Sequence, residues 1–393
     1  MKVTICCKQL VESGGAEAFL ANFARCLLAD GHQVKVLTPR AGADIEGLRV
    51  TRLRLPRVPR SLADLALARA SRTALAADDA DVTFSDQKCW GAHVVRPGGG
   101  VQREYVRQRQ KSYRGPWQRT LNRAFRALSL RERLRIYIDD RLYEPPGPRC
   151  IIANSDMVRR ELVRHYPHLT DRIRVVYNGA DLDRFSPALK NSHRTSVRGE
   201  LGIPQDALVG VFVGHDWRRK GLFAFLEALG ILARRSAPYA PARDAYGIVV
   251  GRGNSRQAEA FAQEAGAAGR VRFVGPGRPD RYYGAADLLV LPSYYDPCAN
   301  VTLEALACGL PVITSVFNGA FELLTPGLNG FYVQDASDSA QLAGFIEYYA
   351  DGARLEAGSG AALALALEHP LKGMYRDIMA AMTETAGRAA PPA

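Results

Sequence analysis

The stretch 287-DLLVLPSYYDPCANVTLEALACGLPVITS-315 decides the fold. Its first seven residues contain the apolar run 288–292, which predicts a buried strand. After a polar loop, the apolar spacing from Val301 predicts a helix. Asn300 is placed to cap this helix and Gly309 to end it. The apolar run after Gly309 predicts a second strand. Strand, helix and strand in this order form a unit with parallel strands, which predicts an α/β fold.

The same alternation continues on the N-terminal side of this stretch. Apolar runs rich in β-branched residues predict strands, which alternate with segments of helical spacing. The predicted strands cover 2–7, 33–38, 149–155, 172–179, 207–214, 245–251 and 270–275. A polar stretch at 186–200 has no apolar period and separates two series of strands. Two doubly wound halves fit this order better than one large sheet.

The chain length supports a division into two domains. With 393 residues, the chain is too long for a single hydrophobic core. The predicted parts are an N-terminal Rossmann-like domain over 1–172, a second Rossmann-like domain over 173–368, a final helix over 369–386 and a disordered tail over 387–393.

The composition is that of a folded protein without a membrane-spanning helix. Hydrophobic residues make up 47% of the chain and charged residues 23%, which excludes a disordered chain. No apolar run approaches the ~18 residues that a spanning helix needs, and the apolar start is too short for a signal peptide. The seven cysteines include no C-x-x-C pair, so neither a disulfide framework nor a zinc site is indicated. These features predict a cytoplasmic protein.

The formal net charge of +12 is concentrated in one segment. Residues 103–135 contain eleven Lys or Arg and two Glu, a net charge of +9. A helix predicted over 117–130 places Arg119, Arg123 and Arg126 on one face. This basic face predicts contact with an anionic membrane surface, although a domain helix with its arginines in water gives the same pattern. Nucleic acid is not the expected partner, since no nucleic-acid-binding motif accompanies the segment.

Two loops between strands and helices could bind an anion. Gly14 and Gly15 lie between the first predicted strand and helix, where glycine lets an anion approach a helix N-terminus closely. Arg219 and Lys220 lie between a later strand and its helix, where two adjacent cations could clamp a diphosphate. Either feature alone has a simpler explanation, as a tight turn or as a solvated run of charges.

Two carboxylates complete the candidate site. Asp296 and Glu304 are eight residues apart, on either side of the predicted helix N-terminus. Carboxylates in these places can accept hydrogen bonds from sugar hydroxyls, while the helix N–H groups face a phosphate. Together with the cationic pair they predict a nucleotide-sugar site.

These residues lie in motifs that resemble the retaining glycosyltransferases of family 4, and most closely those that build lipopolysaccharide core. The segment from Asp296 resembles the E-x7-E motif of the family, with Asp where the family usually has the first Glu. The matching motifs are Gly14-Gly15-Ala16-Glu17, IIANS at 151–155, VVYNGADLDRF at 175–185, Arg219-Lys220-Gly221, VRFVG at 271–275 and DPCANVTLEALACGLPV at 296–312. The resemblance implies a GT-B fold, in which two Rossmann-like domains face a cleft and a C-terminal helix crosses back to the N-terminal domain.

The resemblance also implies a role for each matching residue. Arg219 and Lys220 would bind the donor diphosphate and offset charge on the leaving nucleotide, and Asp296 would contact the donor sugar. Glu304 would hold the ribose hydroxyls. Gly14 and Gly15 would lie near the diphosphate, and Val274 would lie near the base. The backbone N–H groups of residues 297–301, which include Asn300 and Val301, would lie near the phosphates.

On the acceptor side, three residues are candidates for polar contacts. Gln102 follows a glycine-rich stretch at the place where related core transferases are expected to have a histidine, and Asp86 and His93 lie nearby in the sequence. Neither a cofactor nor a metal is expected, because Arg219 and Lys220 supply the positive charge that a metal would bring. The D-x-D sequence at Asp181 and Asp183 is therefore not interpreted as a metal site. The glycine pair at Gly251 and Gly253 is not interpreted as a dinucleotide-binding motif, because it lacks the third glycine.

The expected function is transfer of a hexose from a nucleotide-diphosphate sugar to a lipid-linked acceptor, lipopolysaccharide core, at the cytoplasmic face of the inner membrane. A UDP-sugar is the first choice of donor, with GDP-mannose and ADP-heptose open. Two alternatives keep the fold. A non-catalytic protein that binds anionic membranes would not bind nucleotide diphosphates, and a nucleotide-sugar epimerase would form product from the donor alone.

Overall fold

The computed structural model of the protein describes residues 1–11, 15–113, 115, 117, 120, 129–235 and 244–387, with only the backbone of 15–18. The chain folds into two compact units. Unit 1 comprises Met1–Gln110, Gly115–Tyr177 and Gly373–Ala393. Unit 2 comprises Lys111–Arg114 and Asn178–Lys372.

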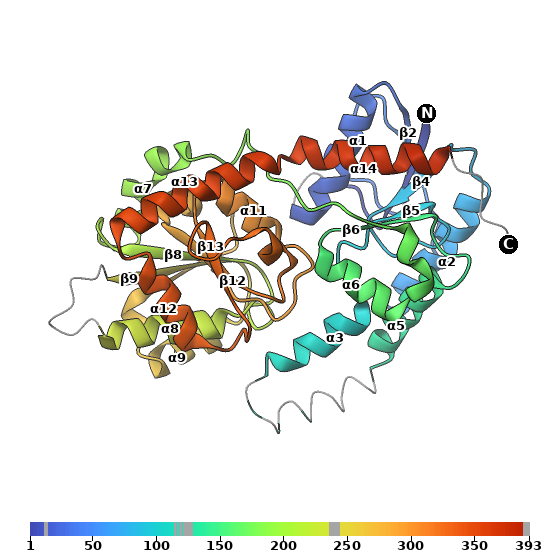
Figure 1. The fold of residues 1–393 in the computed structure, drawn as a ribbon. Coiled ribbons are helices and arrows are strands. Elements are labelled where there is room, and N and C mark those ends of the chain that lie inside the picture. Colours follow the sequence, from blue (N-terminus) through green and yellow to red (C-terminus); the bar gives the residue numbers. More distant parts are fainter. Residues whose placement is uncertain are drawn as a thin grey trace. The chain divides into compact units, whose positions relative to one another are not determined.

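A parallel sheet forms the centre of unit 1 (Figure 1). Its strands are β1 (Lys2–Cys6), β2 (Gln33–Thr38), β3 (Arg49–Arg52), β4 (Val82–Ser85), β5 (Val94–Val95), β6 (Cys150–Ala153) and β7 (Ile173–Val175). They lie in the order β3-β2-β1-β4-β5-β6-β7. Every neighbouring pair is parallel, so all C-terminal ends lie at one edge, where open α/β sheets bind their ligands.

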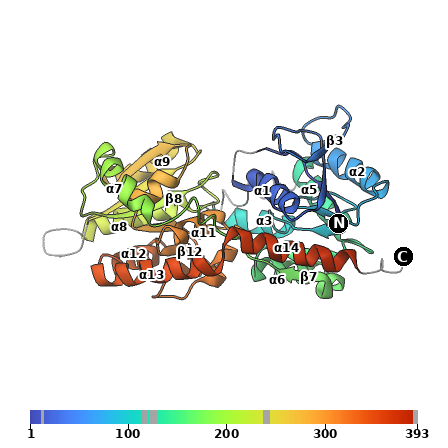
Figure 2. The ribbon, with the colours of Figure 1, turned by 90° about the horizontal axis from the view of Figure 1, so that it is seen from above.

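The helices of unit 1 include the last helix of the chain. They are α1 (Gly15–Ala29), α2 (Ala63–Ala76), α3 (Gln102–Lys111), α5 (Leu130–Tyr143), α6 (Asp156–His165) and α14 (Leu371–Ala386). Figure 2 shows α14 beside α1, and the Tyr375 ring lies 5.6 Å from Phe19 and 5.4 Å from Phe23. At the other end of α14, Arg174 of β7 donates to Glu384 at 2.9 Å. The C-terminal helix therefore completes the core of the N-terminal unit.

Unit 2 has a second parallel sheet with helices on both faces. Its strands are β8 (Leu208–Val213), β9 (Ala245–Val250), β10 (Val271–Gly275), β11 (Leu288–Leu291), β12 (Val312–Ser315) and β13 (Gly330–Val333), in the order β10-β9-β8-β11-β12-β13. Its helices are α7 (Ala188–Glu200), α8 (Leu222–Arg235), α9 (Ser255–Glu264), α10 (Asp280–Ala285), α11 (Asn300–Ala307), α12 (Ser339–Tyr348) and α13 (Gly352–Glu368). In Figure 1, α8, α9 and α12 lie on one side of the sheet and α11 and α13 on the other.

The two helix-covered parallel sheets confirm the predicted α/β fold, although β3, β4, β5 and β13 were not predicted and two further details differ. The polar stretch 186–200 forms α7, because this helix is held by the fully buried Arg198 rather than by an apolar stripe. Asn300 does not cap α11. It is the first residue of the helix, and Ala299 occupies the cap position without a side-chain hydrogen bond. Gly309, with a φ of +70°, follows the helix end as expected.

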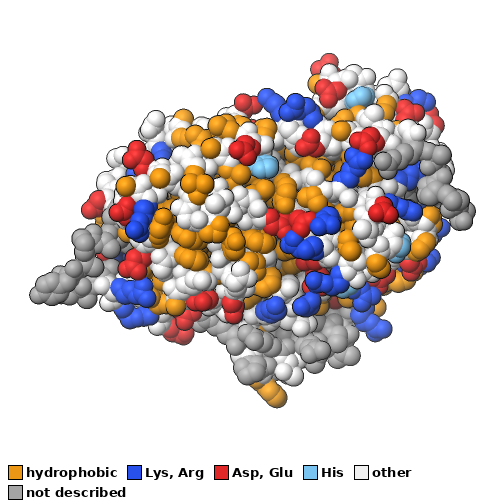
Figure 3. Space-filling view, viewed as in Figure 1, with side chains coloured by type: hydrophobic (Ala, Val, Ile, Leu, Met, Phe, Trp, Pro, Cys, Tyr) orange, Lys and Arg blue, Asp and Glu red, His pale blue; other side chains and the backbone are white. Residues whose placement is uncertain are grey.

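Basic side chains gather over α3, α5 and α6 on the face shown in Figure 3. Several of them form ion pairs: Arg103 lies 2.7 Å from Asp140, and Arg164 lies 3.3 Å from the buried Glu104. No helix among the described residues is long and apolar enough to cross a membrane. The three arginines of the predicted basic helix lie outside the described residues, namely Arg119, Arg123 and Arg126.

Candidate functional site

The cationic pair Arg219 and Lys220 lies in the loop between β8 and α8 of unit 2. A Cβ at Gly214 would lie 3.2 Å from Lys220 Cε, so glycine leaves room for the lysine stem. Gly221 has a φ of +85°, and a Cβ there would lie 2.0 Å from the Pro292 carbonyl oxygen. The loop therefore packs its backbone directly against the segment that follows β11.

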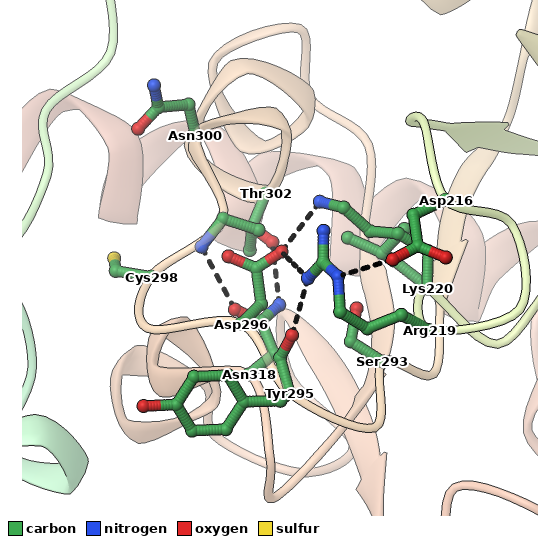
Figure 4. A network of polar contacts seen from close by, with 12 residues as sticks. Asp216, Arg219, Lys220, Ser293, Tyr295, Asp296, Cys298, Asn300, Thr302 and Asn318 are labelled. Carbon is green, nitrogen blue, oxygen red and sulfur yellow. Dashed lines mark hydrogen bonds and ion pairs between the residues drawn. The ribbon is translucent and has the colours of Figure 1, made fainter. Parts of the chain in front are cut away.

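Asp296 lies in that segment and contacts both cations, as Figure 4 shows. Its Oδ2 is 2.6 Å from Lys220 Nζ and 3.6 Å from Arg219 Nη1. Arg219 also donates through Nη1 to the Tyr295 carbonyl oxygen at 2.6 Å and through Nε to Asp216 at 3.3 Å. Burial acts to raise the pKa of Asp296, but Lys220 and Arg219 outweigh it and hold that pKa below its usual range. Asp296 is thus ionised at neutral pH and orients both cations.

The loop 296–300 is fixed by Asn318, a residue that sequence reasoning missed. Asn318 Oδ1 accepts a hydrogen bond from the Ala299 N–H at 3.0 Å, and Asn318 Nδ2 donates to Thr302 Oγ1 at 3.1 Å. The backbones of Asp296 and Asn318 also form an isolated parallel bridge. These partners are 16 to 22 residues apart, which leaves no local pattern to read. Asn318 therefore sets the position of the carboxylate that the cations contact.

A second support of the helix N-terminus comes from the motif VVYNGADLDRF. Asn178 of this motif is buried, and its Nδ2 donates to the Cys298 carbonyl oxygen at 2.7 Å and to Asn300 Oδ1 at 2.5 Å. The start of α11, with Asn300 and Val301, is thereby tied to the segment after β7. This motif thus has a structural role beside the candidate site.

Glu304 lies one turn into α11 and is partly buried. Tyr283 Oη donates to Glu304 Oε2 at 2.9 Å. Burial raises the pKa of Glu304, and it outweighs the hydrogen bond from Tyr283 and the positive charge of Arg184, which lower that pKa. The two carboxylates of the motif therefore have opposite shifts, because Asp296 contacts cations and Glu304 does not.

We expect the substitution Glu304→Gln to stabilise unit 2 and to weaken donor binding. A carboxyl whose pKa is raised by folding destabilises the folded protein as the pH rises from the unfolded pKa, and the loss is complete above the folded pKa. Gln carries no charge there and can still accept the bond from Tyr283. A gain of 1 kcal/mol would raise Tm by roughly 2–4 °C for a unit of this size.

Thermal unfolding between pH 4 and pH 8 checks this expectation. The difference in Tm between the Glu304→Gln variant and the unsubstituted protein should be largest at pH 8 and shrink toward pH 4. The control Glu356→Gln lies on an exposed part of α13 and should leave Tm unchanged. A lower Tm for Glu304→Gln at pH 8 would contradict the assignment of a burial penalty to Glu304.

Val274 lies in β10, where the register with β9 shifts. Its neighbour Phe273 packs on Trp217, with ring centroids 5.7 Å apart, and Trp217 follows β8 and is buried. A Cβ at Gly253 would lie 2.1 Å from the Trp217 ring, and one at Gly251 would lie 2.1 Å from a backbone oxygen. Close packing therefore accounts for these two glycines, and Trp217 is a further residue that the sequence did not single out.

In unit 1, Asp86 and Gln102 lie at the C-terminal edge of the sheet, and His93 lies at the opposite edge. Asp86 directly follows β4, and Gln102 begins α3 after β5. The Gln102 N–H donates to the buried Asp139 at 2.8 Å. His93 directly precedes β5, and its carbonyl oxygen accepts from the Cys150 N–H at 3.1 Å. The structure therefore brings two of the three acceptor-side candidates to one edge and leaves His93 apart.

Gly15 begins α1, whereas Gly14 lies outside the described residues. Within the described ranges, no group of three or more His, Cys, Asp or Glu side chains could hold a metal ion. The two aspartates of the D-x-D sequence have other contacts. Asp181 Oδ1 accepts from the Arg184 N–H at 3.3 Å, and Asp183 lies 3.3 Å from Lys372 Nζ.

Two units, each with a parallel sheet covered by helices, define the GT-B class of glycosyltransferase folds. Solved structures of other proteins have the same fold. A crystal structure of WaaG, a glycosyltransferase involved in lipopolysaccharide biosynthesis, matches 97% of this chain and 99% of its own at a TM-score of 0.78 and 22% identity. Anabaena Alr3699/HepE in complex with UDP-glucose matches 98% of this chain and 100% of its own at a TM-score of 0.70 and 19% identity. At these identities the likeness concerns the fold alone.

Sequence matches give the family. Residues 13–184 match the model of Glycosyltransferase Family 4, and residues 207–351 match that of Glycosyl transferases group 1. The chain belongs to this family of glycosyltransferases, which confirms the expected resemblance. A curated relative from Streptomyces scabiei, D-inositol 3-phosphate glycosyltransferase, is 36% identical over 222 residues, which are 54% of this chain and 49% of the relative. The chain spans about half the length of the curated relatives it matches.

Proposed function

We propose that the protein transfers a hexose, with retention of configuration, from a UDP-sugar to an acceptor. The observation that carries this proposal is the cluster of Arg219, Lys220 and Asp296 at the C-terminal edge of the unit 2 sheet, beside the N-terminus of α11. This edge is where open parallel sheets bind nucleotides. The family membership and the UDP-glucose complex of the Anabaena neighbour support the same donor class.

Each side chain of the cluster has a defined task in this proposal. Lys220 has three N–H donors and reaches Asp296 with one of them, so the others can turn to a phosphate oxygen. Arg219 and Lys220 stabilise the negative charge that develops on the leaving diphosphate, a task for fixed cations in a site shielded from water. Asp296 contacts the donor sugar, and Glu304 accepts hydrogen bonds from the ribose hydroxyls. No metal is needed for these steps.

The proposed acceptor is a lipid-linked glycan, lipopolysaccharide core, at the cytoplasmic face of the inner membrane. The basic segment 103–135 supports an anionic surface as partner. A second acceptor is favoured by the curated relatives, which are named D-inositol 3-phosphate glycosyltransferases and so act on a phosphorylated cyclitol. Both acceptors share the candidate residues Asp86 and Gln102 at the edge of the unit 1 sheet.

A thermal-shift screen of nucleotide sugars tests the donor assignment. UDP-glucose at 100 times its Kd should stabilise the protein by about 2.7 kcal/mol, whereas glucose alone should have no effect. GDP-mannose and ADP-heptose decide between the donor bases. If none of these nucleotide sugars raises Tm, the protein has no donor site and the proposal is wrong.

The sugar that gives the largest shift then serves as the donor in a transfer assay. Lipopolysaccharide core and D-inositol 3-phosphate are the two acceptors compared. We expect glycosylated product with one of them and no product from the donor alone. A product formed without any acceptor would instead identify a nucleotide-sugar epimerase.

A further inference from the structure

A cavity of about 630 Å³ opens in unit 1 beside the ends of β2 and β3. Four arginines line it, namely Arg40, Arg52, Arg54 and Arg57. Apolar residues from the segment after β3 and from the first turn of α2 complete its wall. The cavity lies at the C-terminal edge of the unit 1 sheet, the edge that also holds Asp86 and Gln102.

The charges of these four arginines are not neutralised by neighbouring carboxylates. Their side chains are exposed, no acidic residue lines the cavity, and none of the four forms an ion pair in the part of the chain that the structure describes. Other arginines of unit 1 are paired: Arg103 lies 2.7 Å from Asp140, and Arg135 lies 3.2 Å from Asp64. Four like charges around one hollow repel each other, which an anionic ligand would relieve.

The local sequence restricts the backbone of the segment that carries three of these arginines. In 49-RVTRLRLPRVPR-60 the side chains alternate along an extended backbone, so Arg52 and Arg54 share one face while Leu53 is buried on the other. The Leu53 N–H donates to the Thr38 carbonyl oxygen at 3.0 Å, which continues the pairing with β2 past the end of β3. Two prolines in the segment restrict its backbone further.

The opposite wall is fixed as well. The Arg40 carbonyl oxygen accepts from the Leu10 N–H at 3.0 Å and from Thr38 Oγ1 at 3.1 Å. The backbones on both sides of the cavity are thus tied to the sheet, and the backbone needs little ordering when a ligand binds. A preorganised site loses less conformational entropy on binding.

We propose that this cavity binds the phosphate ester of a phosphorylated sugar or cyclitol. Guanidinium groups bind phosphate oxygens in a bidentate way, and the apolar wall can contact the carbon face of a sugar ring. The volume lies in the range of ~300–1,000 Å³ that small-molecule sites occupy. A recess of this size takes one phosphorylated ring rather than a flat membrane surface. That the ligand is part of the acceptor rests on the proposed function, whereas its binding does not.

Arginine modification by phenylglyoxal, mapped by mass spectrometry, locates the ligand. UDP is present throughout to occupy the donor site. We expect glucose 6-phosphate to slow the modification of Arg40, Arg52, Arg54 and Arg57, and glucose to have no effect. Arg49 and Arg60 lie in the same segment but do not line the cavity, so their rates should not change. Protection by phosphatidylglycerol vesicles without protection by glucose 6-phosphate would show a membrane contact and overturn the proposal.

A matched pair of double variants distinguishes binding in the cavity from a general effect of positive charge on the surface. Arg40→Gln with Arg54→Gln should weaken glucose 6-phosphate binding by at least about tenfold, because each lost charge-assisted bond is worth that much. Arg49→Gln with Arg60→Gln removes the same charge outside the cavity and should change Kd less than about twofold. An equal loss in both variants would overturn the proposal.

The thermal shift with UDP-glucose separates this inference from the proposed function. Both double variants should keep the shift, because their substitutions lie in unit 1. If the unsubstituted protein binds glucose 6-phosphate but shows no shift with any nucleotide sugar, the proposed function fails and the cavity assignment stands. If the shift is present and no phosphorylated sugar protects the four arginines, only the cavity assignment fails.

Discussion

The substitution Lys220→Ala is expected to reduce sugar transfer by about 10²- to 10³-fold, since removal of a single fixed donor at a developing negative charge has an effect of this size. Lys220 Nζ lies 2.6 Å from Asp296, and Lys220 lies two residues before α8, at the sheet edge where we propose that the diphosphate binds. Unit 2 should still fold, because Arg219 remains 3.6 Å from Asp296. Release of UDP in the presence of acceptor measures the rate, and circular dichroism checks the fold.

Two further variants give this prediction its controls. Lys372→Ala removes an exposed lysine whose partner is the exposed Asp183, and it should leave the rate unchanged. The double variant Lys220→Ala with Asp296→Asn removes both charges of the ion pair. It should be more stable than the Lys220→Ala variant, whose Asp296 has lost a partner, but it should be no more active. Turnover at the unsubstituted rate in the Lys220→Ala variant would rule out the donor assignment.

The substitution Arg198→Met is expected to destabilise unit 2 by about 3–5 kcal/mol, because it leaves a buried carboxylate without its main partner. Arg198 is fully buried, and its Nη2 lies 2.9 Å from Asp287 Oδ2. It also donates to the carbonyl oxygens of Ala285 and Ala207, both at 2.9 Å. Loss of this side chain removes the contacts that tie α7 to the end of α10 and to the residues directly before β8 and β11. Calorimetry should show a Tm lower by roughly 2–4 °C for each kcal/mol.

The pH dependence provides an independent check of the same pair. Burial acts to raise the pKa of Asp287, but Arg198 and Arg194 outweigh it and lower that pKa. A carboxyl with a lowered pKa adds stability above its unfolded pKa and loses it as the pH falls through the folded value. The Arg198→Met variant should therefore lose less stability than the unsubstituted protein on acidification. Glu200→Gln, which breaks an exposed pair with Arg281, should cost less than about 1 kcal/mol; a similar cost in both variants would contradict the assignment.

The sequence allowed prediction of the parallel sheets because their strands are buried on both faces. The runs 208–213 and 288–291 consist almost wholly of apolar residues, which strands of this kind require. Helix α7 gave no such signal, since its main contact is the buried charge of Arg198. Strands β3, β4, β5 and β13 have at most four residues each and were not predicted. Because the two-residue strand β5 was among them, the position of His93 relative to the sheet edges was undetermined.

In the candidate site, too, the sequence allowed prediction of some residues and not of others. Arg219, Lys220 and Asp296 could be predicted to meet because each follows a strand, and β8 and β11 are neighbours in the sheet. Asn318 and Tyr283 could not, because each reaches the site from a segment that has no motif of its own. The hydrogen bonds that fix the carboxylates thus come from residues that only the folded structure identifies.

The position of α14 has a consequence for the synthesis of the protein on the ribosome. Phe19 and Phe23 are made before unit 2, yet Tyr375, which packs on both, follows about 200 residues of unit 2. At ~5–20 residues per second, those residues take about 10 to 40 s to translate. Throughout that interval the nascent N-terminal unit has an uncovered apolar surface on α1. Chaperones that bind nascent chains should therefore occupy this surface until α14 has been made.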